Sequence, residues 1–329
     1  MQKKFKSLKI CIIGYGSIGR RHAQNLQKLG VENILIFRTG KAHPDAPNYD
    51  KKLNFFYNFE EVISQKPDAM FICNTTNLHS EYALKAVKNR CHVFIEKPIG
   101  NNLNHMEKIK YYLDNYKLIS AVGYMMRFDP LVLQAKDIIE NNKLGNITSA
   151  IFEWGTHLPS WHKWEDYSQS YAAKKDLGGG LILTCSHEID LIRFLLGDIQ
   201  KIMAYGGKKS YLNIEVEDHV DILSKHENGI TSYLHLDWFQ QPEHRTFKII
   251  GDKGNINWNF HTNTLLINID NKVQEKVAPL ANWKLNDLYL DIVTDFLTSI
   301  VENKESKCSF NDGLLTLKDT IKILNKIKN

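Results

Sequence analysis

The sequence of 329 residues lacks the features of several protein classes. No stretch approaches the roughly 20 consecutive apolar residues of a membrane span. Its five cysteines form no CxxC pair and no regular spacing, so neither a disulfide framework nor a zinc site is supported. The net charge of +5 is spread along the chain, which is not typical of a nucleic-acid binder. The basic N-terminal residues run directly into a strand-like segment, without the features of a signal peptide. We therefore expect a cytoplasmic protein with no nucleic-acid, membrane or metal partner.

The chain is longer than one hydrophobic core usually serves, which favours two domains. Apolar residues make up 43% of the chain and charged residues 24%, as is ordinary for a globular protein. Apolar, strand-like runs alternate with helical patterns in the first part of the chain; these runs lie at residues 8–13, 33–38, 68–74, 91–96 and 117–124. This alternation predicts a parallel sheet with helices on both faces.

After about residue 124 the pattern changes. One helical stretch at 130–142 is followed by several alternating, strand-like segments, and "HENGI" and "GDKGN" have the composition of hairpin turns. Two further helices are expected at about 283–301 and 311–327. The predicted fold class is α/β: an N-terminal dinucleotide-binding domain at 1–123, and an α+β domain at 124–329 with a large, mainly antiparallel, open-faced sheet. The C-terminal helices could pack back on the first domain.

A glycine-rich turn joins the first predicted strand to the first predicted helix. Gly14, Gly16 and Gly19, with Ser17 and Ile18 between them, form a GxGxxG pattern. The first glycine permits the tight turn, the second lets a pyrophosphate approach the backbone, and the third allows close packing of helix and strand. A bare GxGxxG also occurs as a simple turn in other α/β proteins, but here strand, turn and helix all agree. We predict that these five residues bind a dinucleotide.

The end of the second predicted strand lacks the acidic residue that would bind the adenosine ribose of NAD. Arg38 and Lys41 stand there instead. An arginine at this position can stack on adenine or pair with a 2′-phosphate, so NADP is favoured over NAD. A solvated loop arginine with no ligand is the alternative.

Several motifs together resemble the glucose–fructose oxidoreductase and inositol dehydrogenase (Gfo/Idh/MocA) family. The resemblance covers essentially the whole chain and rests on "GYGSIG", "CNTTNLHSEYALKAV", "EKP", "GYMMRFDP" and "LGGGLILTCSHEIDLIRFLLG". It implies a Rossmann domain, a second open-faced domain, and an active site between them.

The motif Glu96-Lys97-Pro98 follows an apolar strand directly. The resemblance implies that Lys97 lies beside the nicotinamide, where it touches both cofactor and substrate. Ligands of open α/β sheets bind at the carboxyl ends of the strands, and a partly desolvated lysine there can have its pKa lowered towards the range useful for proton transfer. Pro98 fixes the backbone, in a bond that is often cis in this family. Glu96 can anchor the loop and is also a candidate for contact with the cofactor. A lone lysine at a strand end would otherwise be a surface residue.

The loop after the strand at 68–73 matches the one that lines the cofactor in this family. Its candidates for contact with ribose or nicotinamide are Asn74, Thr75, Asn77 and His79. Each of them could instead be a turn or N-cap residue, and His79 a structural histidine.

The motif at Tyr124–Phe128 matches the crossing into the second domain. The resemblance implies that Tyr124 and Arg127 face the cofactor side of the cleft, with Arg127 on the cofactor and Tyr124 on the substrate.

A glycine triplet precedes a helix that carries His187 and Asp190 one turn apart. In many relatives an aspartate precedes this histidine by four residues, and the histidine contacts the reacting hydroxyl. Here Leu183 and Thr184 stand where that aspartate would be, so a three-residue catalytic set is in doubt. His187 can still accept a proton by itself near neutral pH, and a packed structural histidine is the alternative. Asp190 is expected to orient a neighbour or to pack at the domain junction.

Specificity is expected in the segment between the first strand of the second domain and the glycines. Trp161, Tyr167 and Tyr171 suit stacking on a sugar or base and hydrogen bonding to hydroxyls. The pattern resembles a branch of the family that modifies sugars of bacterial surface glycans. Lys174 or Lys175 could meet an anionic group, although solvated surface lysines are commoner.

These observations predict an NAD(P)-dependent dehydrogenase or reductase that acts on a secondary alcohol of a sugar, with a nucleotide-activated or amino sugar as candidate. Lys97 and His187 are the predicted catalytic residues. The alternative is a catalytically silent cofactor or sugar sensor of the same fold, since the family also supplies regulatory proteins. Apolar residues on both sides of the strand alternation in the second sheet predict a homodimer or homotetramer.

Overall fold

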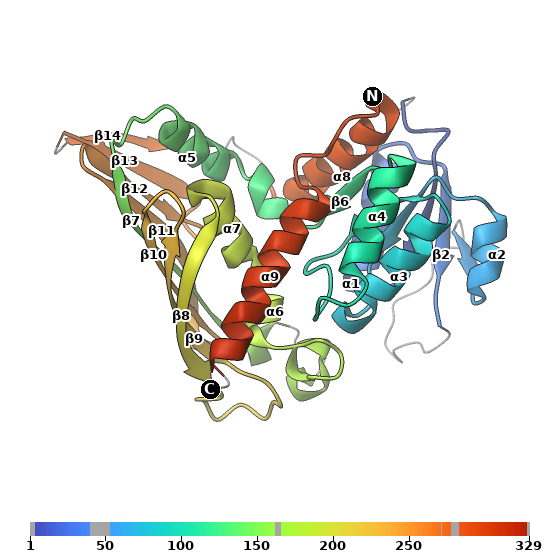
Figure 1. Ribbon diagram of the computed structural model, residues 1–329, viewed down its shortest axis with the longest axis horizontal. Helices are drawn as coiled ribbons and strands as arrows, with labels where there is room; N and C mark the ends of the chain where they lie inside the picture. Colours follow the sequence, from blue (N-terminus) through green and yellow to red (C-terminus); the bar gives the residue numbers. More distant parts are fainter. Residues whose placement is uncertain (1–3, 40–52, 162–165, 271, 278–282, 328–329) are drawn as a thin grey trace. The chain divides into compact units, whose positions relative to one another are not determined.

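The computed structural model describes residues 4–39, 53–161, 166–270, 272–277 and 283–327. The chain divides into two compact units: the first comprises Met1–Met125 and Leu285–Leu314, and the second Met126–Lys284 and Leu315–Asn329 (Figure 1). No helix in the described ranges is long and apolar enough to cross a membrane.

The first unit contains a six-stranded parallel sheet in the order β3-β2-β1-β4-β5-β6. Its elements are β1 (Lys9–Ile13), α1 (Ser17–Lys28), β2 (Asn33–Phe37), β3 (Asn54–Phe56), α2 (Phe59–Ser64), β4 (Ala69–Ile72), α3 (Thr76–Lys88), β5 (His92–Ile95), α4 (Met106–Tyr116), β6 (Ser120–Val122) and α8 (Leu285–Glu302). The strand order reverses between β1 and β4, and ligands of such sheets bind at this switch point.

The central strands β1 and β4 are short and almost fully buried, as expected for parallel strands between helices. The stacked rings of Phe71 on β4 and Phe94 on β5 contact Phe296 of α8 edge-on. Asn25 of α1 and Asn286 of α8 are hydrogen-bonded at 3.0 Å. The distant helix α8 therefore completes the core of the first unit. Truncation of a buried phenylalanine such as Phe296 typically costs about 3–5 kcal/mol.

The second unit contains an eight-stranded sheet in the order β14-β13-β12-β11-β7-β10-β9-β8. Only the pair β7 and β10 is parallel. Its strands are β7 (Ile147–His157), β8 (Ile199–Gly207), β9 (His219–His226), β10 (Thr231–Asp237), β11 (Phe239–Gly251), β12 (Gly254–Asn259), β13 (Thr264–Ile269) and β14 (Lys272–Val277).

Helices of the second unit lie on one face of this sheet (Figure 1). They are α5 (Pro130–Glu140), α6 (Leu181–Thr184) and α7 (Ser186–Leu196). The chain also forms the 3-10 turns η1 (Met125–Phe128), η2 (Leu158–Ser160), η3 (Tyr167–Gln169) and η4 (Tyr171–Ala173). The last helix, α9 (Phe310–Ile327), begins in the first unit and ends in the second. Asp129 caps α5 by accepting from the backbone N–H groups of Leu131 and Val132.

This architecture confirms the predicted α/β class, with a parallel Rossmann sheet and a large, mainly antiparallel second sheet. The sequence reading missed the short elements β3 and α2 and the edge strand β14. They are too short, or too polar, to give a clear hydrophobic period.

Candidate active site

The three glycines of the turn after β1 have different structural roles. Gly14 has a φ of +94°, and a Cβ there would lie 2.8 Å from the backbone nitrogen of Asn74. A Cβ on Gly19 would lie 2.2 Å from the carbonyl oxygen of Gly14, so this glycine allows the turn to close on α1. A Cβ on Gly16 would meet no atom within 4 Å. Space is therefore left at Gly16, at the N-terminus of α1, where the helix dipole favours an anion.

The Asn74 loop lies against this turn at the switch point of the sheet. Both polar atoms of the Asn74 side chain are buried, and neither has a hydrogen-bond partner among the described residues. The Thr75 hydroxyl donates to the Asn77 side chain at 2.6 Å rather than capping α3. Buried amide groups are normally hydrogen-bonded, so Asn74 is suited to a partner that the chain itself does not supply. Ser17 is exposed and Ile18 half-buried beside this space.

His79 connects the loops that follow β4 and β5. Its Nδ1 lies 2.6 Å from the carbonyl oxygen of Pro98, and its Nε2 lies 2.9 Å from that of Asn74. Burial lowers the pKa of His79, although the two carbonyl contacts oppose this effect. The ring therefore sets the spacing of the two loops, and a direct contact of His79 with a cofactor stays a prediction.

Lys97 follows β5 and is half-buried, and the Lys97–Pro98 bond is cis, as the family resemblance implied. The preceding Glu96 is buried, with one oxygen 2.7 Å from His22 Nε2 on α1 and the other 3.3 Å from the backbone nitrogen of Lys97. Burial opposes ionisation of Glu96, but the hydrogen bond from His22 and the charge of Lys97 prevail, so its pKa is lowered. Glu96 anchors the loop from inside the protein.

Two residues near Lys97 were missed by the sequence reading. His22 stands in the apolar stripe of α1 and is fully buried, and this polar residue at a core position was the available signal. Tyr289 of α8 lies under the Arg21 guanidinium, 4.4 Å from the ring centre. Burial, reinforced by the charge of Glu96, raises the pKa of Tyr289. Its place in α8, about two hundred residues along the chain, gave no sequence signal.

Arg38 lies at the end of β2, half-buried, and its backbone nitrogen donates to the Phe56 carbonyl on β3. An arginine therefore lies at the end of the second strand, where an acidic residue would bind the adenosine ribose of NAD. Lys41, the other residue considered there, lies outside the described residues.

Tyr124 and Arg127 fall on either side of the division between the two units. Tyr124 is fully buried in the first unit, and its assignment to the substrate stays a prediction. The Arg127 guanidinium binds both oxygens of Asp190 on α7, at 2.8 and 2.7 Å. Arg127 thus orients α7 within the second unit, and its predicted contact with the cofactor is untested.

Helix α7, which carries His187, is fixed by buried ion pairs. Besides the pair of Asp190 with Arg127, Glu188 lies 2.5 Å from Arg245 of β11, and Arg193 lies 2.6 Å from Asp319 of α9. Burial raises the pKa of Glu188, and Arg245 only partly offsets this. His187 on the same helix is buried to 6% exposure. The ion pairs set the rotation of α7 and hence the direction of His187.

The positions of the missing aspartate, Leu183 and Thr184, are both buried in α6. A carboxylate nevertheless lies at the start of this helix: an oxygen of Glu217 accepts from the backbone nitrogen of Ile182 at 3.1 Å. A Cβ on Gly180 would lie 2.6 Å from the same oxygen, so the glycine makes room for it. Sequence reading missed Glu217 because it comes from a loop more than thirty residues away.

The predicted specificity segment is described except for residues 162–165. Trp161 donates to the Thr156 hydroxyl at 2.9 Å, and its ring contacts Trp238 edge-on. The Tyr167 hydroxyl accepts from the backbone nitrogen of Asn213 at 3.2 Å. Tyr171 is 38% exposed. All three belong to the second unit, where Trp161 and Tyr167 hold the segment in place and Tyr171 reaches solvent.

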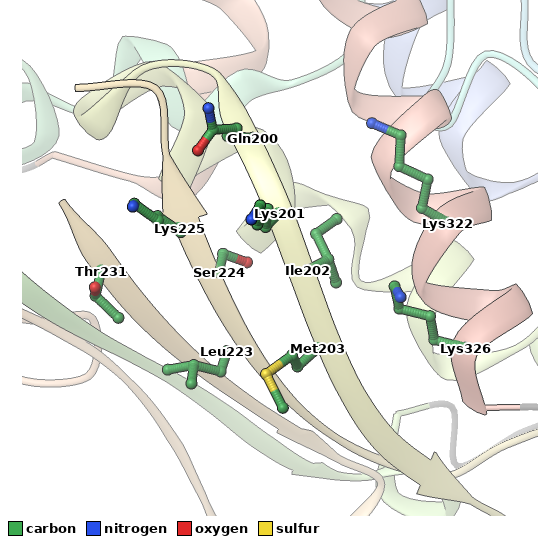
Figure 2. A pocket seen from close by; sticks show the side chains of 10 residues that line it. All are labelled: Gln200, Lys201, Ile202, Met203, Leu223, Ser224, Lys225, Thr231, Lys322 and Lys326. Atoms are coloured by element: carbon green, nitrogen blue, oxygen red, sulfur yellow. The ribbon is translucent and has the colours of Figure 1, made fainter. Parts of the chain in front are cut away.

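A cavity of about 550 Å³ lies elsewhere in the second unit, around the edge strand β8. Figure 2 shows Lys322 and Lys326 extending from α9 on one side, with Lys201 and Met203 on β8. None of the predicted site residues lines it. Its surface lysines do not by themselves constitute a binding site.

Two family models match the chain on either side of the crossing. Residues 8–124 match "Oxidoreductase family, NAD-binding Rossmann fold", and residues 132–257 match "GFO/IDH/MocA C-terminal domain". The chain belongs to the Gfo/Idh/MocA family. The predicted family is thereby confirmed, and the first unit carries the family's NAD-binding Rossmann domain.

Relatives within the Gfo/Idh/MocA family are distant in sequence. The chain is 24% identical to "Uncharacterized oxidoreductase YrbE" of Bacillus subtilis over 92% of its own length and 89% of that protein. It is 25% identical to "Myo-inositol 2-dehydrogenase" of Thermotoga maritima over 60% of its own length and 58% of that protein.

Solved structures of similar fold include a levoglucosan dehydrogenase in complex with NADH. It matches with a TM-score of 0.84 and 19% identity, over 98% of this chain and 97% of that one. The WlbA dehydrogenase from Bordetella pertussis, in complex with NADH and UDP-GlcNAcA, matches with a TM-score of 0.80 and 17% identity, over 98% and 96%. At these identities the likeness shows the fold.

The residues of the glycine turn fit a dinucleotide. Ligands of such sheets bind at the end where the glycine turn lies, and there the structure has the space at Gly16, the helix N-terminus behind it, and the Asn74 amide, which has no partner among the described residues. Gly14, Gly16, Ser17 and Asn74 would hold the cofactor, whose chemistry is hydride exchange at the nicotinamide.

Proposed function

We propose that this protein is an NAD(P)-dependent dehydrogenase or reductase that interconverts a secondary alcohol and a ketone of a sugar. The observation that carries the proposal is the position of Lys97 at the carboxyl end of β5, held by the buried pair of Glu96 and His22, in the same sheet as the glycine turn. Ligands of a Rossmann sheet bind at this edge, so a lysine held there can contact the reacting atoms.

The proposed roles of Lys97 and His187 differ. Bound NAD(P) supplies the hydride acceptor or donor. Lys97 holds the charge of the reacting oxygen and exchanges its proton, and His187 binds the same hydroxyl from the substrate side. Glu96, His22 and His79 position the lysine loop, whereas Arg127 and Asp190 position His187. Lowering the barrier depends mainly on holding the reacting groups in near-attack geometry.

The substrate class is a sugar, with a nucleotide-activated or amino sugar as the finer candidate. Support comes from a relative named as an inositol dehydrogenase and from two structural neighbours, a levoglucosan dehydrogenase and the WlbA dehydrogenase in complex with UDP-GlcNAcA. Tyr171, exposed on the specificity segment, suits stacking on a sugar ring. Trp161 and Tyr167 complete the proposed substrate set, together with Tyr124.

NADP is the proposed preferred cofactor, because Arg38 stands where an acidic residue would select NAD. The NADH complexes among the structural neighbours leave NAD as the alternative. Calorimetric titration with both cofactors decides between them: tighter binding of NADP is expected, and tighter binding of NAD would overturn this preference. Thr75, Asn77 and His79 are proposed to contact the same cofactor.

A homo-oligomer through the open face of the second sheet is proposed as the working form. Met203, Leu223, Tyr233 and Ile151 are paired across β8, β9, β10 and β7, and each is between 38% and 55% exposed. Such a row of apolar side chains usually marks an interface. Light scattering should report a dimer or tetramer, and a monomer at micromolar concentration would contradict the proposal.

The cytoplasm is the proposed compartment, because all five cysteines are free and buried. The second domain, residues 124–329, is proposed to bind substrate and to form the oligomer.

Turnover of NAD(P) with a panel of sugars tests the function. Mass spectrometry of the purified protein should first identify any nucleotide or sugar that remains bound. Reduction of cofactor by at least one sugar is expected. A protein that binds both ligands tightly but turns over none of the panel would support the alternative, a cofactor or sugar sensor of the same fold.

A further inference from the structure

Four metal-ligand side chains gather on the open face of the second sheet, next to the apolar row. His219 and Asp221 lie on β9, and His235 and Asp237 lie on β10. The strand register pairs His235 with Asp221 and Asp237 with His219. His219, Asp221 and His235 each offer one ligand atom, and these three atoms lie within 4.8 Å of one another. The side chains of these three residues are 22–34% exposed, so the cluster is accessible from solvent in the single chain.

The hydrogen bonds of Asp237 determine which nitrogen of His235 can bind a cation. One oxygen of Asp237 accepts from the backbone nitrogens of Phe239 and Gln240 at 2.9 and 2.7 Å, and its other oxygen lies 3.1 Å from His235 Nε2. Asp237 is 1% exposed and held rigidly as an acceptor. His235 Nε2 therefore carries a hydrogen, and in the neutral ring the lone pair lies on Nδ1.

The lone pair of His235 Nδ1 points at a carboxylate. Nδ1 lies 2.8 Å from an oxygen of Asp221, and two acceptors at this distance require a cation between them. The Tyr233 hydroxyl donates to the same Asp221 oxygen at 2.6 Å and fixes its direction. A proton on Nδ1 satisfies this requirement at the observed distance, and a metal ion bonded to both atoms would replace that proton and move the two atoms about 0.5 Å further apart. Carboxylates that accept from the outer nitrogen of a ligating histidine are the usual support of metal sites, and Asp237 has that position.

His219 supplies the third donor. Its Nε2 lies 3.2 Å from the second oxygen of Asp221, whereas its Nδ1 is buried without a partner among the described residues. The ring packs between His235 and Phe239, which limits its rotation. Two imidazole nitrogens and a carboxylate oxygen around one point form a donor set that suits Zn²⁺, with a fourth position open to water.

We propose that His219, Asp221 and His235 bind a zinc ion on the open face of the second sheet, with Asp237 orienting His235. The expectation from the sequence was that the protein has no metal site, because no ligand spacing was apparent. The ligands come from two strands, and only their pairing brings them together. The site is separate from Lys97 and His187, so it does not depend on the proposed reaction.

Zinc titration of the untagged full-length protein against a chromogenic chelator tests the site. We expect stoichiometric binding of one ion per chain. His219→Ala and His235→Ala should each weaken binding by more than the roughly 10- to 100-fold that loss of an outer partner costs. His261→Ala is the matched control, because this exposed histidine lies in the turn between β12 and β13; it should leave the affinity unchanged.

Asp237→Asn gives a test that does not remove a ligand. The asparagine oxygen can still accept from the two backbone nitrogens, but its NH₂ group now donates to His235 Nε2. The hydrogen moves to Nδ1, so zinc affinity should fall roughly 10- to 100-fold while the melting temperature without zinc changes little. Equal zinc binding by wild type, His235→Ala and Asp237→Asn would overturn the proposal and leave the cluster as a proton-bridged network.

Discussion

His22 on α1 and Glu96 at the end of β5 are hydrogen-bonded at 2.7 Å inside the first unit. Both are buried. The pair joins the helix that follows the glycine turn to the loop that carries Lys97, so the proposed cofactor site and the proposed catalytic lysine share one internal support.

Replacement of His22 should damage both stability and chemistry. His22→Leu fills the space but leaves the Glu96 carboxylate buried without its partner. Breaking a buried pair in this way typically costs about 3–5 kcal/mol. We expect a correspondingly lower free energy of unfolding in urea, and a reduced kcat in the protein that remains folded. The paired replacement His22→Leu with Glu96→Met should recover most of the stability but not the activity. Unchanged stability of His22→Leu would contradict the structural role.

The same pair predicts an acid-dependent stability. The pKa of Glu96 is lowered in the folded protein from its ordinary value of 4.5, so its contribution is fully present above pH 4.5 and is lost as the pH falls through the folded pKa. Thermal unfolding between pH 3 and 6 should show this loss. In His22→Leu the hydrogen bond that lowers the Glu96 pKa is gone and burial raises that pKa, so this loss of stability on acidification should become smaller or disappear. The same dependence of stability on pH in wild type and His22→Leu would contradict this role of the pair.

The glycines of the turn should respond differently to substitution. Gly16→Asp places a side chain and a negative charge in open space beside the proposed pyrophosphate, so the protein should fold normally and lose cofactor affinity. Gly19→Ala instead forces a Cβ to within 2.2 Å of the Gly14 carbonyl, so it should lower stability. Calorimetry with NADP and NAD measures the cofactor affinity, and thermal unfolding measures the stability. Undiminished affinity of Gly16→Asp would refute the cofactor assignment.

Lys97 should be the most damaging single position for turnover, with His187 second. General acid–base groups typically contribute ~10²–10⁴-fold to the rate, so Lys97→Ala should lose at least that much while still folding. His187→Ala should lose less if the lysine accepts the proton, and about as much if the histidine does.

Lys97→Arg distinguishes these cases, because arginine keeps the charge but releases no proton near neutral pH. Turnover of Lys97→Arg near the wild-type rate would show that the lysine contributes only its charge and that the histidine is the base. Full activity of Lys97→Ala on the true substrate would show that the assignment is wrong.

The sequence by itself determined the elements that have a strong local signal. The strand-turn-helix at Gly14–Gly19 was predictable because the hydrophobic period, the glycine spacing and the helix pattern all lie within about twenty residues. The apolar run before Glu96 and the hairpin turns of the second sheet were predictable for the same reason. The motif content also determined the family, since several short patterns had to occur together and in order.

Tertiary structure decided the contacts that have no local signal. His22 and Glu96 are 74 residues apart, Ile182 and Glu217 are 35 apart, and Arg127 and Asp190 are 63 apart. Nothing in a single sequence specifies such pairings, because they depend on strand order and helix packing. The cluster of His219, Asp221 and His235 depends on register in the same way, since a slip of one residue between β9 and β10 would place the ligands on opposite faces of the sheet.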